Sequence, residues 1–259
     1  VSTPFVLTGI GSAAAGVTYT WEQFDSASDS STANSNSTAY PEKPNGPLFR
    51  SVRPGSSLVR YMPELNTVLL NKLTTTWESV SSVARTLHFT LTARDNGASA
   101  VAQTNTDTMI ATVVTNAGPF TVTSQNTDDV SWPIGSNQTV TWAVNNTNTL
   151  QGSSAVNIKL STDGGLTFPV ILASNTPNDG SQTVQIPTSV TASTNCRLKI
   201  EPTANIYYAL NSKPFAVGYT STTTCDSYSF GNAFAIHPGN SFTSKTVNVP
   251  ASTGTISDV

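Results

Sequence analysis

VNIKLSTDGGLTFPVILAS, from Val156 to Ser174, is the most informative segment for the fold class, because it reads as two short strands joined by a glycine turn. The turn matches the Asp-box pattern SxDxGxTF. In such a hairpin the aspartate accepts backbone N–H bonds, the glycines adopt conformations that other residues resist, and the aromatic ring packs beneath. We predict a structural turn here, with a ligand or calcium contact as the alternative, and its residues are Ser161, Asp163, Gly165 and Phe168.

Similar strand-like stretches continue on both sides of this hairpin. Turn clusters such as PNDG, from Pro177 to Gly180, separate them. About seven or eight short strands in roughly 100 residues indicate an immunoglobulin-like sandwich. We expect Trp142 to lie in its core. The predicted strands are FTVTS, VSWPI, QTVTWAV, AVNIKLS, PVILAS, QTVQIP, CRLKIEP and PFAVGY.

The segment before residue 118 also reads as β structure. Alternating apolar residues in Val17–Phe24 and Arg85–Asn96 predict two half-buried strands. PLFRSV, SLVRYMP and MIATVV are strand-like, and Glu64–Leu73 is predicted as a helical turn or loop. Residues 25–40 are polar and of low complexity, which predicts a long exposed loop.

Composition agrees with an all-β chain of tandem sandwiches. Charged residues make up 10% of the 259 residues, against about 25% in typical soluble domains. The net charge of -3 gives no reason to expect nucleic acid as a partner, and no apolar run is long enough to span a membrane. We predict domains at 1–117 and 118–219, followed at 220–259 by a linker and a short β-segment that reads as the beginning of a further domain.

Several of these stretches resemble non-catalytic modules of secreted reprolysin-like zinc metalloproteases of Bacteroidota. GPFTVTSQN, VTWAVNNTNT and NIYYALNSKPFAV resemble their immunoglobulin-like module. VTYTWEQFD, PLFRSVRPGSSLVRYMPEL and RTLHFTLTARDN resemble the preceding cadherin-like or PKD-like module, and GTISDV resembles the start of a P-like jelly roll. The resemblance implies an accessory region of a secreted or cell-surface protein. This chain has Ala13-Ala14-Ala15-Gly16 where the family has an acidic run.

No catalytic arrangement emerges from the sequence. A zinc protease needs two histidines one helical turn apart with a glutamate between them, and the two histidines here are His88 and His237. No GxSxG nucleophile elbow is present either. We therefore expect no enzyme activity in this chain, and we expect any protease activity of the parent protein to lie in another domain.

Three weaker site hypotheses remain. Calcium prefers oxygen ligands, and the candidate set is Glu22, Asp25, Asp95, Asn96 and Asp107. Asp-Ser/Thr-apolar triplets, which are O-glycosylated in Bacteroidota export proteins, occur at Ser26 and Thr108. Cys196 and Cys225 form a disulfide in an oxidising compartment or are two unrelated thiols.

Three functions stay open at this point. The first is an accessory region that provides spacing, adhesion or substrate engagement without a required cofactor. The second is a structural subunit of an extracellular fibre, in which a strand near Lys245–Val249 completes a neighbour's sheet. The third is a carbohydrate-binding module, for which Trp77 and Trp132 would supply the aromatic platform.

Overall fold

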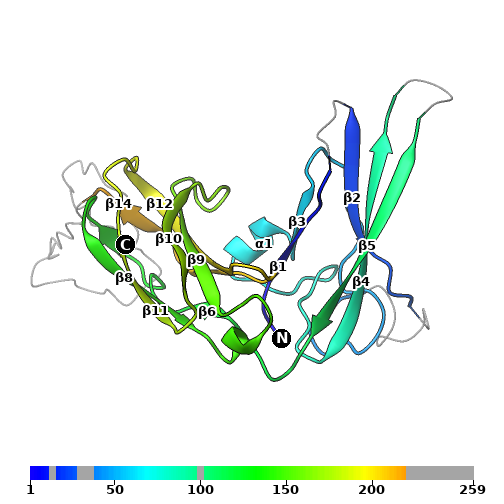
Figure 1. Cartoon of the computed structure of the whole chain (residues 1–259), viewed down its shortest axis with the longest axis horizontal. Helices are drawn as coiled ribbons and strands as arrows, with labels where there is room; N and C mark the ends of the chain where they lie inside the picture. The colour runs from blue at the N-terminus through cyan, green and yellow to red at the C-terminus, as the bar shows by residue number, and fades with distance from the viewer. Residues whose placement is uncertain (12–15, 28–37, 98–101, 220–259) are drawn as a thin grey trace, which may run out of the picture. The chain divides into compact units, whose positions relative to one another are not determined.

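The computed structural model describes residues 1–11, 16–27, 38–97 and 102–219 (Figure 1). All of them belong to one compact unit, Val1–Ser221. The all-β prediction is confirmed, because sheets dominate the described residues and the two helical elements are short. The predicted β-segment at 220–259 lies outside the described residues, and the boundary at residue 117 stays a prediction.

The N-terminal part contains two sheets. Strand β4 runs through the middle of the larger sheet, whose order is β2-β4-β5, and β1 pairs with β3 in the smaller one. The predicted helical turn is present as the short helix α1. The bounds are β1 Phe5–Thr8, β2 Val17–Gln23, β3 Val59–Met62, α1 Leu65–Leu69, β4 Arg85–Asp95 and β5 Thr104–Val113.

The C-terminal part is a sandwich of two sheets, as predicted. One sheet has the order β11-β8-β6, and the other has β10-β9-β12-β14-β7 with β13 beside β12. All eight predicted strands are present. Their bounds, with those of β13 and the 3-10 helix η1, are β6 Thr121–Val122, β7 Ser131–Trp132, β8 Asn137–Ala143, η1 Thr147–Thr149, β9 Ala155–Ser161, β10 Val170–Pro177, β11 Ser181–Gln185, β12 Ser193–Pro202, β13 Ala209–Leu210 and β14 Phe215–Val217.

A single hydrophobic core runs through both parts. Its buried residues include Phe5 and Phe89 from the N-terminal part and Phe120 and Tyr207 from the C-terminal part. Phe5 packs edge-on against Phe89, and Phe120 packs edge-on against Tyr207, with ring centroids 5.9 and 5.1 Å apart. Trp142 is buried, which confirms its predicted place in the core. Continuous burial of this kind favours cooperative unfolding of the whole unit.

Two details of the sequence prediction are wrong. PLFRSV forms no regular strand: Phe49 makes an isolated bridge to Glu78, although its side chain is buried. Thr20 and Thr92, expected on the solvent face of their strands, are buried as well. Arg94 accounts for part of this, because its guanidinium folds over the strand and donates a hydrogen bond to the Thr20 hydroxyl. Period-2 alternation does not reveal such coverage by a long side chain.

Candidate functional site

Strand β1 joins the two parts of the molecule through its backbone. One edge pairs with β3, with Phe5 opposite Met62 and Thr8 opposite Val59. On the other edge, the Val6 amide donates to the Ile206 carbonyl at 2.8 Å, and the Tyr208 amide donates to the Pro4 carbonyl at 3.0 Å. We call β1, β3 and residues 206–208 the junction. Both edges of β1 are therefore paired.

Side chains on the outer face of β12 strengthen the junction. The Arg197 guanidinium donates to the Leu69 carbonyl at the end of α1 and to the Asn211 carbonyl. The Lys199 ammonium is paired with Glu201 at 2.7 Å. It also lies over three aromatic rings, 5.3 to 5.7 Å from their centroids, and these rings belong to Tyr61, Phe168 and Tyr208. Tyr61 comes from β3, so this cation–π cluster links the two parts.

The Asp-box turn has the predicted structure and connects β9 to β10. The Asp163 carboxylate accepts hydrogen bonds from the Ser161 hydroxyl at 2.5 Å and from the Thr167 amide and hydroxyl. Burial alone would raise the pKa of Asp163, but these hydrogen bonds outweigh it and lower the pKa to about 2. The turn therefore depends on a charged Asp163.

The same turn is also part of the junction. Gly165 has φ +96°, and a Cβ at this position would lie 2.5 Å from Leu69 Cδ2. Leu69 belongs to α1, so the glycine lets the hairpin approach the N-terminal part closely. Phe168 is half-buried and lies near the Lys199 ammonium. The sequence predicted the turn but not this contact.

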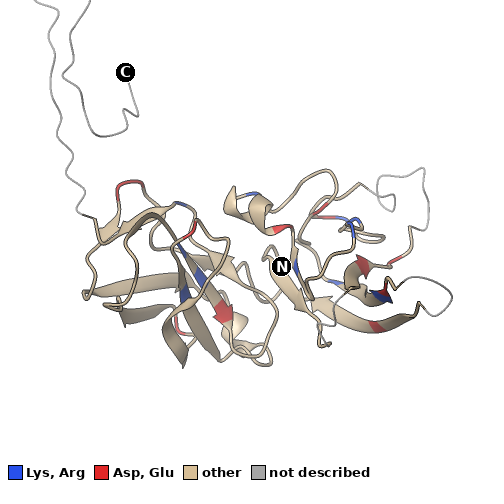
Figure 2. Cartoon of the chain, turned by 90° about the horizontal axis from the view of Figure 1, so that it is seen from above, with Lys and Arg blue, Asp and Glu red and all other residues tan. Residues whose placement is uncertain are grey.

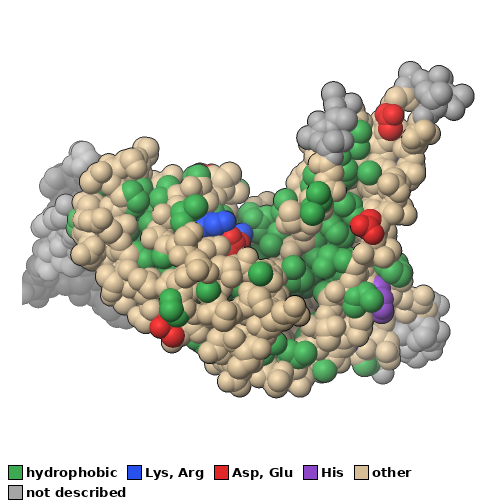
Figure 3. Space-filling model, viewed as in Figure 1, with side chains coloured by type: hydrophobic (Ala, Val, Ile, Leu, Met, Phe, Trp, Pro, Cys, Tyr) green, Lys and Arg blue, Asp and Glu red, His purple; other side chains and the backbone are tan. Residues whose placement is uncertain are grey.

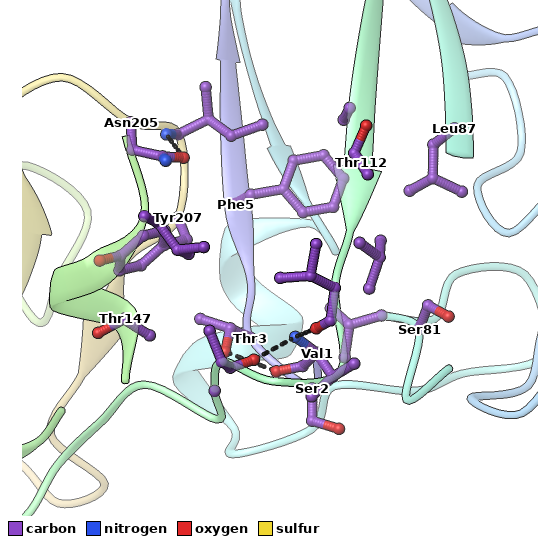
Figure 4. Close-up of a pocket in the computed structure, with 18 of the residues that line it drawn as sticks. Val1, Ser2, Thr3, Phe5, Ser81, Leu87, Thr112, Thr147, Asn205 and Tyr207 are labelled. Carbon is purple, nitrogen blue, oxygen red and sulfur yellow. Dashed lines mark hydrogen bonds between the residues drawn. The ribbon is translucent and has the colours of Figure 1, made fainter. Parts of the chain in front are cut away.

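A cavity of about 450 Å³ lies beside the junction (Figure 4). Phe5 projects toward Thr112 of β5, and Asn205 and Tyr207 lie on the opposite side. The side chains that line the cavity are apolar or carry uncharged polar groups. This volume falls within the range of small-ligand pockets, about 300 to 1,000 Å³. The Val1 α-ammonium is bonded to the Val114 and Ala117 carbonyls, and the uncharged side chains around it suit apolar or peptide-like groups better than ions.

The candidate calcium ligands do not share a site. Asp25 lies next to His88, whose Nδ1 is 2.6 Å from the Asp25 carboxylate. Asp95 is the last residue of β4 and Asn96 follows it, and the Asp95 carboxylate accepts a hydrogen bond from the Gly97 amide. Glu22 and Asp107 lie opposite Thr90 and Leu91 of β4. Across the described ranges, no group of three or more His, Cys, Asp or Glu side chains could hold a metal ion. Calcium binding stays a prediction.

The remaining predicted residues are placed as follows. Ser26 and Thr108 are both exposed, so their glycosylation stays a prediction about accessible hydroxyls. Cys196 is buried and forms no disulfide with a described residue, and burial raises the pKa of its thiol above the usual range. Cys225 lies outside the described residues, so the pairing of the two cysteines stays untested. A raised pKa lowers thiol reactivity, because the thiolate is the nucleophile.

The aromatic platform expected for glycan binding is smaller than predicted. Trp132 is buried against Phe215, with ring centroids 4.7 Å apart, so it cannot supply part of an exposed platform. Trp77 is 44% exposed, but the Arg50 guanidinium lies 4.7 Å from its ring centroid and covers one face. Of the two tryptophans predicted for the platform, only Trp77 can therefore stack on a sugar ring, and only with one face.

Charge is sparse over the described surface, as Figures 2 and 3 show. The buried charges that exist have structural partners. Arg60 donates to Glu78 at 2.9 Å and to the Trp21 carbonyl, and the half-buried Lys159 pairs with the half-buried Glu201 at 2.5 Å. The sequence analysis missed Arg197 and Lys199 as junction residues. Their signal was two basic residues that alternate with Cys196, Leu198 and Ile200 in the strand CRLKIEP.

Comparison with known proteins identifies no family. No family model matches the sequence, and no curated protein matches it. A solved structure from Bacteroides ovatus has some similarity to this chain: SGBP-B of the mixed-linkage glucan utilization locus, in complex with a mixed-linkage heptasaccharide. It is 13% identical over 83% of this chain, which spans 40% of that protein, with a TM-score of 0.21. So low a TM-score supports no conclusion about fold or function.

Within the described residues, no helix is long and apolar enough to cross a membrane.

Proposed function

We propose that this chain is a non-catalytic accessory region of a secreted or cell-surface multidomain protein, and that it holds its neighbours at a fixed spacing. The observation that carries this proposal is the backbone pairing of β1 with both parts of the molecule. Paired β strands resist rotation because every bond of the ladder would have to break together. A tandem array joined by a plain linker has no such restraint.

The placement of charge supports a structural role. Arg197 and Lys199 would be costly to bury alone, and both are used to connect the parts. The resemblance to modules of reprolysin-like metalloproteases motivates the further proposal that the parent protein is such an enzyme. The full reading frame tests this: an upstream HExxH motif would support it, and its absence would count against it.

The fixed spacing can be measured with a pair of spin labels. One label would replace Thr86 on β4 and the other Ile171 on β10, both exposed, in a background with Cys196 and Cys225 changed to alanine. A narrow distance distribution, unchanged by moderate heating, is expected. A broad distribution would refute the fixed spacing. Matching unfolding midpoints before and after labelling would serve as the control.

The non-catalytic role has its own test. The purified chain should leave a general protein substrate such as casein intact, both with added zinc and with a chelator. Chelator-sensitive cleavage by the chain itself would show that the proposal is wrong.

A second candidate function is a subunit of an extracellular fibre assembled by strand addition. The observation in its favour is that β5 lies at the edge of its sheet. The Lys245–Val249 segment predicted as the donor lies outside the described residues. Electron microscopy of the native material would show fibres if this role is correct, and a strictly monomeric particle would count against it.

A further inference from the structure

The free edge of β5 can be resolved residue by residue. In an antiparallel ladder, opposite residues alternate between exchanging two hydrogen bonds and exchanging none. The Asp95 amide donates to the Gln103 carbonyl at 2.9 Å, and the register continues from this pair along the whole of β5. Odd-numbered residues of β5 therefore bond to β4. Even-numbered residues, from Thr104 to Thr112, direct their N–H and C=O groups away from the sheet.

The first half of this edge is blocked by its own side chains. The Asn105 amide oxygen accepts a bond from the Thr106 N–H at 3.0 Å, and the Asp107 carboxylate accepts one from the Thr108 N–H at 2.8 Å. The Asp107 charge also discourages the approach of another strand. In the second half, the N–H groups of Ile110 and Thr112 have no partner among the described residues.

This open half faces a second cavity. Residues 109–112 form one wall, and the opposite wall consists of Gln151, Gly152 and residues 204–206, with about 660 Å³ between them. The cavity shares Ala111, Ile206 and other lining residues with the one beside the junction. No charged side chain lines either cavity. Ile110 is 64% exposed at this edge. The unpaired N–H groups of Ile110 and Thr112 therefore lie beside a cavity that no charged side chain lines.

We propose that the Ile110–Thr112 edge of β5 binds an extended, uncharged peptide segment of a partner protein as an added strand. Backbone groups in an open edge are matched by the backbone of another strand, which would lie about 4.8 Å from β5. Alternate side chains of the peptide would extend the inner face beside Met109 and Ala111. A charged residue there would lose its hydration without gaining a partner, so these positions should be apolar.

The probe is a short synthetic peptide of alternating Thr and Val with blocked, uncharged ends. The control peptide has the same length and the same blocked ends but consists of Pro alone, so it has no N–H donors along its backbone. Fluorescence anisotropy should show binding of the first peptide and none of the second. Hydrogen exchange should show new protection of the Ile110 and Thr112 amides. Absence of binding at about 1 mM, a weak-affinity limit, or protection at another strand instead would overturn the proposal.

Two matched variants locate the binding edge. Thr112→Pro removes an open N–H, whereas Thr106→Pro removes one that is already bonded to Asn105. We expect Thr112→Pro to weaken peptide binding about tenfold or more and Thr106→Pro to leave it unchanged. Equal weakening by both would overturn the proposal. Ile110→Lys, which keeps the backbone intact and places a charge at the edge, gives the same test if Thr112→Pro does not fold.

A third variant should act in the opposite direction. Asp107→Ala frees the Thr108 N–H and removes the charge, so it should tighten binding a few-fold. Weaker binding in this variant would contradict the assignment of Asp107 as a blocking residue. Sedimentation of the chain without peptide tests whether a second copy of the chain binds at this edge instead. If the chain forms a dimer that Ile110→Lys abolishes, and if no peptide binds, then a second copy occupies the edge and the peptide proposal is overturned.

Discussion

Strands β1 and β5 border the same cavity but differ in how their edges are used. β1 is short and has a partner on each side, in β3 and in residues 206–208. β5 is longer and pairs with β4 alone. Both have little charge. The difference shows that a strand's length and composition do not decide whether its edge is closed, because the closing partner comes from elsewhere in the chain.

The comparison also separates stability from recognition. The edges of β1 lie within the core, so changes there should act on folding. The edge of β5 is exposed, so changes there should act on binding. The predictions below test this separation in order of decreasing effect on stability.

The largest effect is expected at the junction. Phe5 is 8% exposed and packs edge-on against Phe49 and Phe89. Phe5→Ala should lower the free energy of unfolding by about 3–5 kcal/mol, as measured by urea denaturation. Ile110→Ala on β5 is the matched control and should change it by less than about 0.5 kcal/mol. If Phe5→Ala shows two unfolding transitions, and one of them has the same midpoint as the unsubstituted chain, then the N-terminal and C-terminal parts fold independently.

A smaller loss is expected in the Asp-box turn. Gly165→Ala places a Cβ against Leu69 at a positive φ, and the backbone strain alone should cost about 1–3 kcal/mol. Gly135→Ala is the control, because φ is +81° there but the nearest atom lies 3.8 Å away. Thermal unfolding should show a larger loss for Gly165→Ala, partly recovered by Leu69→Ala. Equal losses of stability in the two variants would mean that the close contact between residue 165 and Leu69 does not contribute to the loss in Gly165→Ala.

A gain in stability is expected at Tyr208. Its hydroxyl is buried and has no hydrogen-bond partner in the part of the chain that the structure describes. Tyr208→Phe removes this unsatisfied group and should raise the free energy of unfolding by about 1 kcal/mol. Tyr207→Phe should also raise the free energy of unfolding, since the Tyr207 hydroxyl is likewise buried without a hydrogen-bond partner among the described residues. A clear loss in chemical denaturation would indicate that the hydroxyl has a partner in solution.

The smallest effect is a pH dependence in the turn. Asp163 has a pKa of about 2 in the folded chain against an ordinary value of 3.8. A depressed carboxyl pKa contributes stability that is fully present above the ordinary value and is lost as pH falls through the folded value. Unfolding curves should therefore show a loss between about pH 4 and pH 2 that is reduced in Asp163→Asn. An identical pH profile in the variant would contradict the role of the charge.

Much of the fold could be predicted because its signals are local. Eight of the nine described strands of the C-terminal part, the Asp-box hairpin and the burial of Trp142 follow from alternation, turn residues and a short motif. The sequence alone allowed Trp132 as a residue of a glycan-binding platform, because its packing partner Phe215 belongs to β14, in a distant part of the sequence. The acidic residues proposed for calcium lie at separate places on the β2-β4-β5 sheet, which their sequence positions alone did not reveal.

The class of structure, the position of most strands and the chemistry of one turn can be read from the sequence, since each depends on residues a few positions apart. Which strand edges are closed becomes visible in the folded chain alone. The pairing of β1 with residues 206–208 joins segments about 200 positions apart, and no local pattern encodes it. The open edge at Ile110 and Thr112 likewise follows from a register that begins with Asp95 and Gln103. Backbone hydrogen bonding has no residue code, so long-range pairing leaves no local signature.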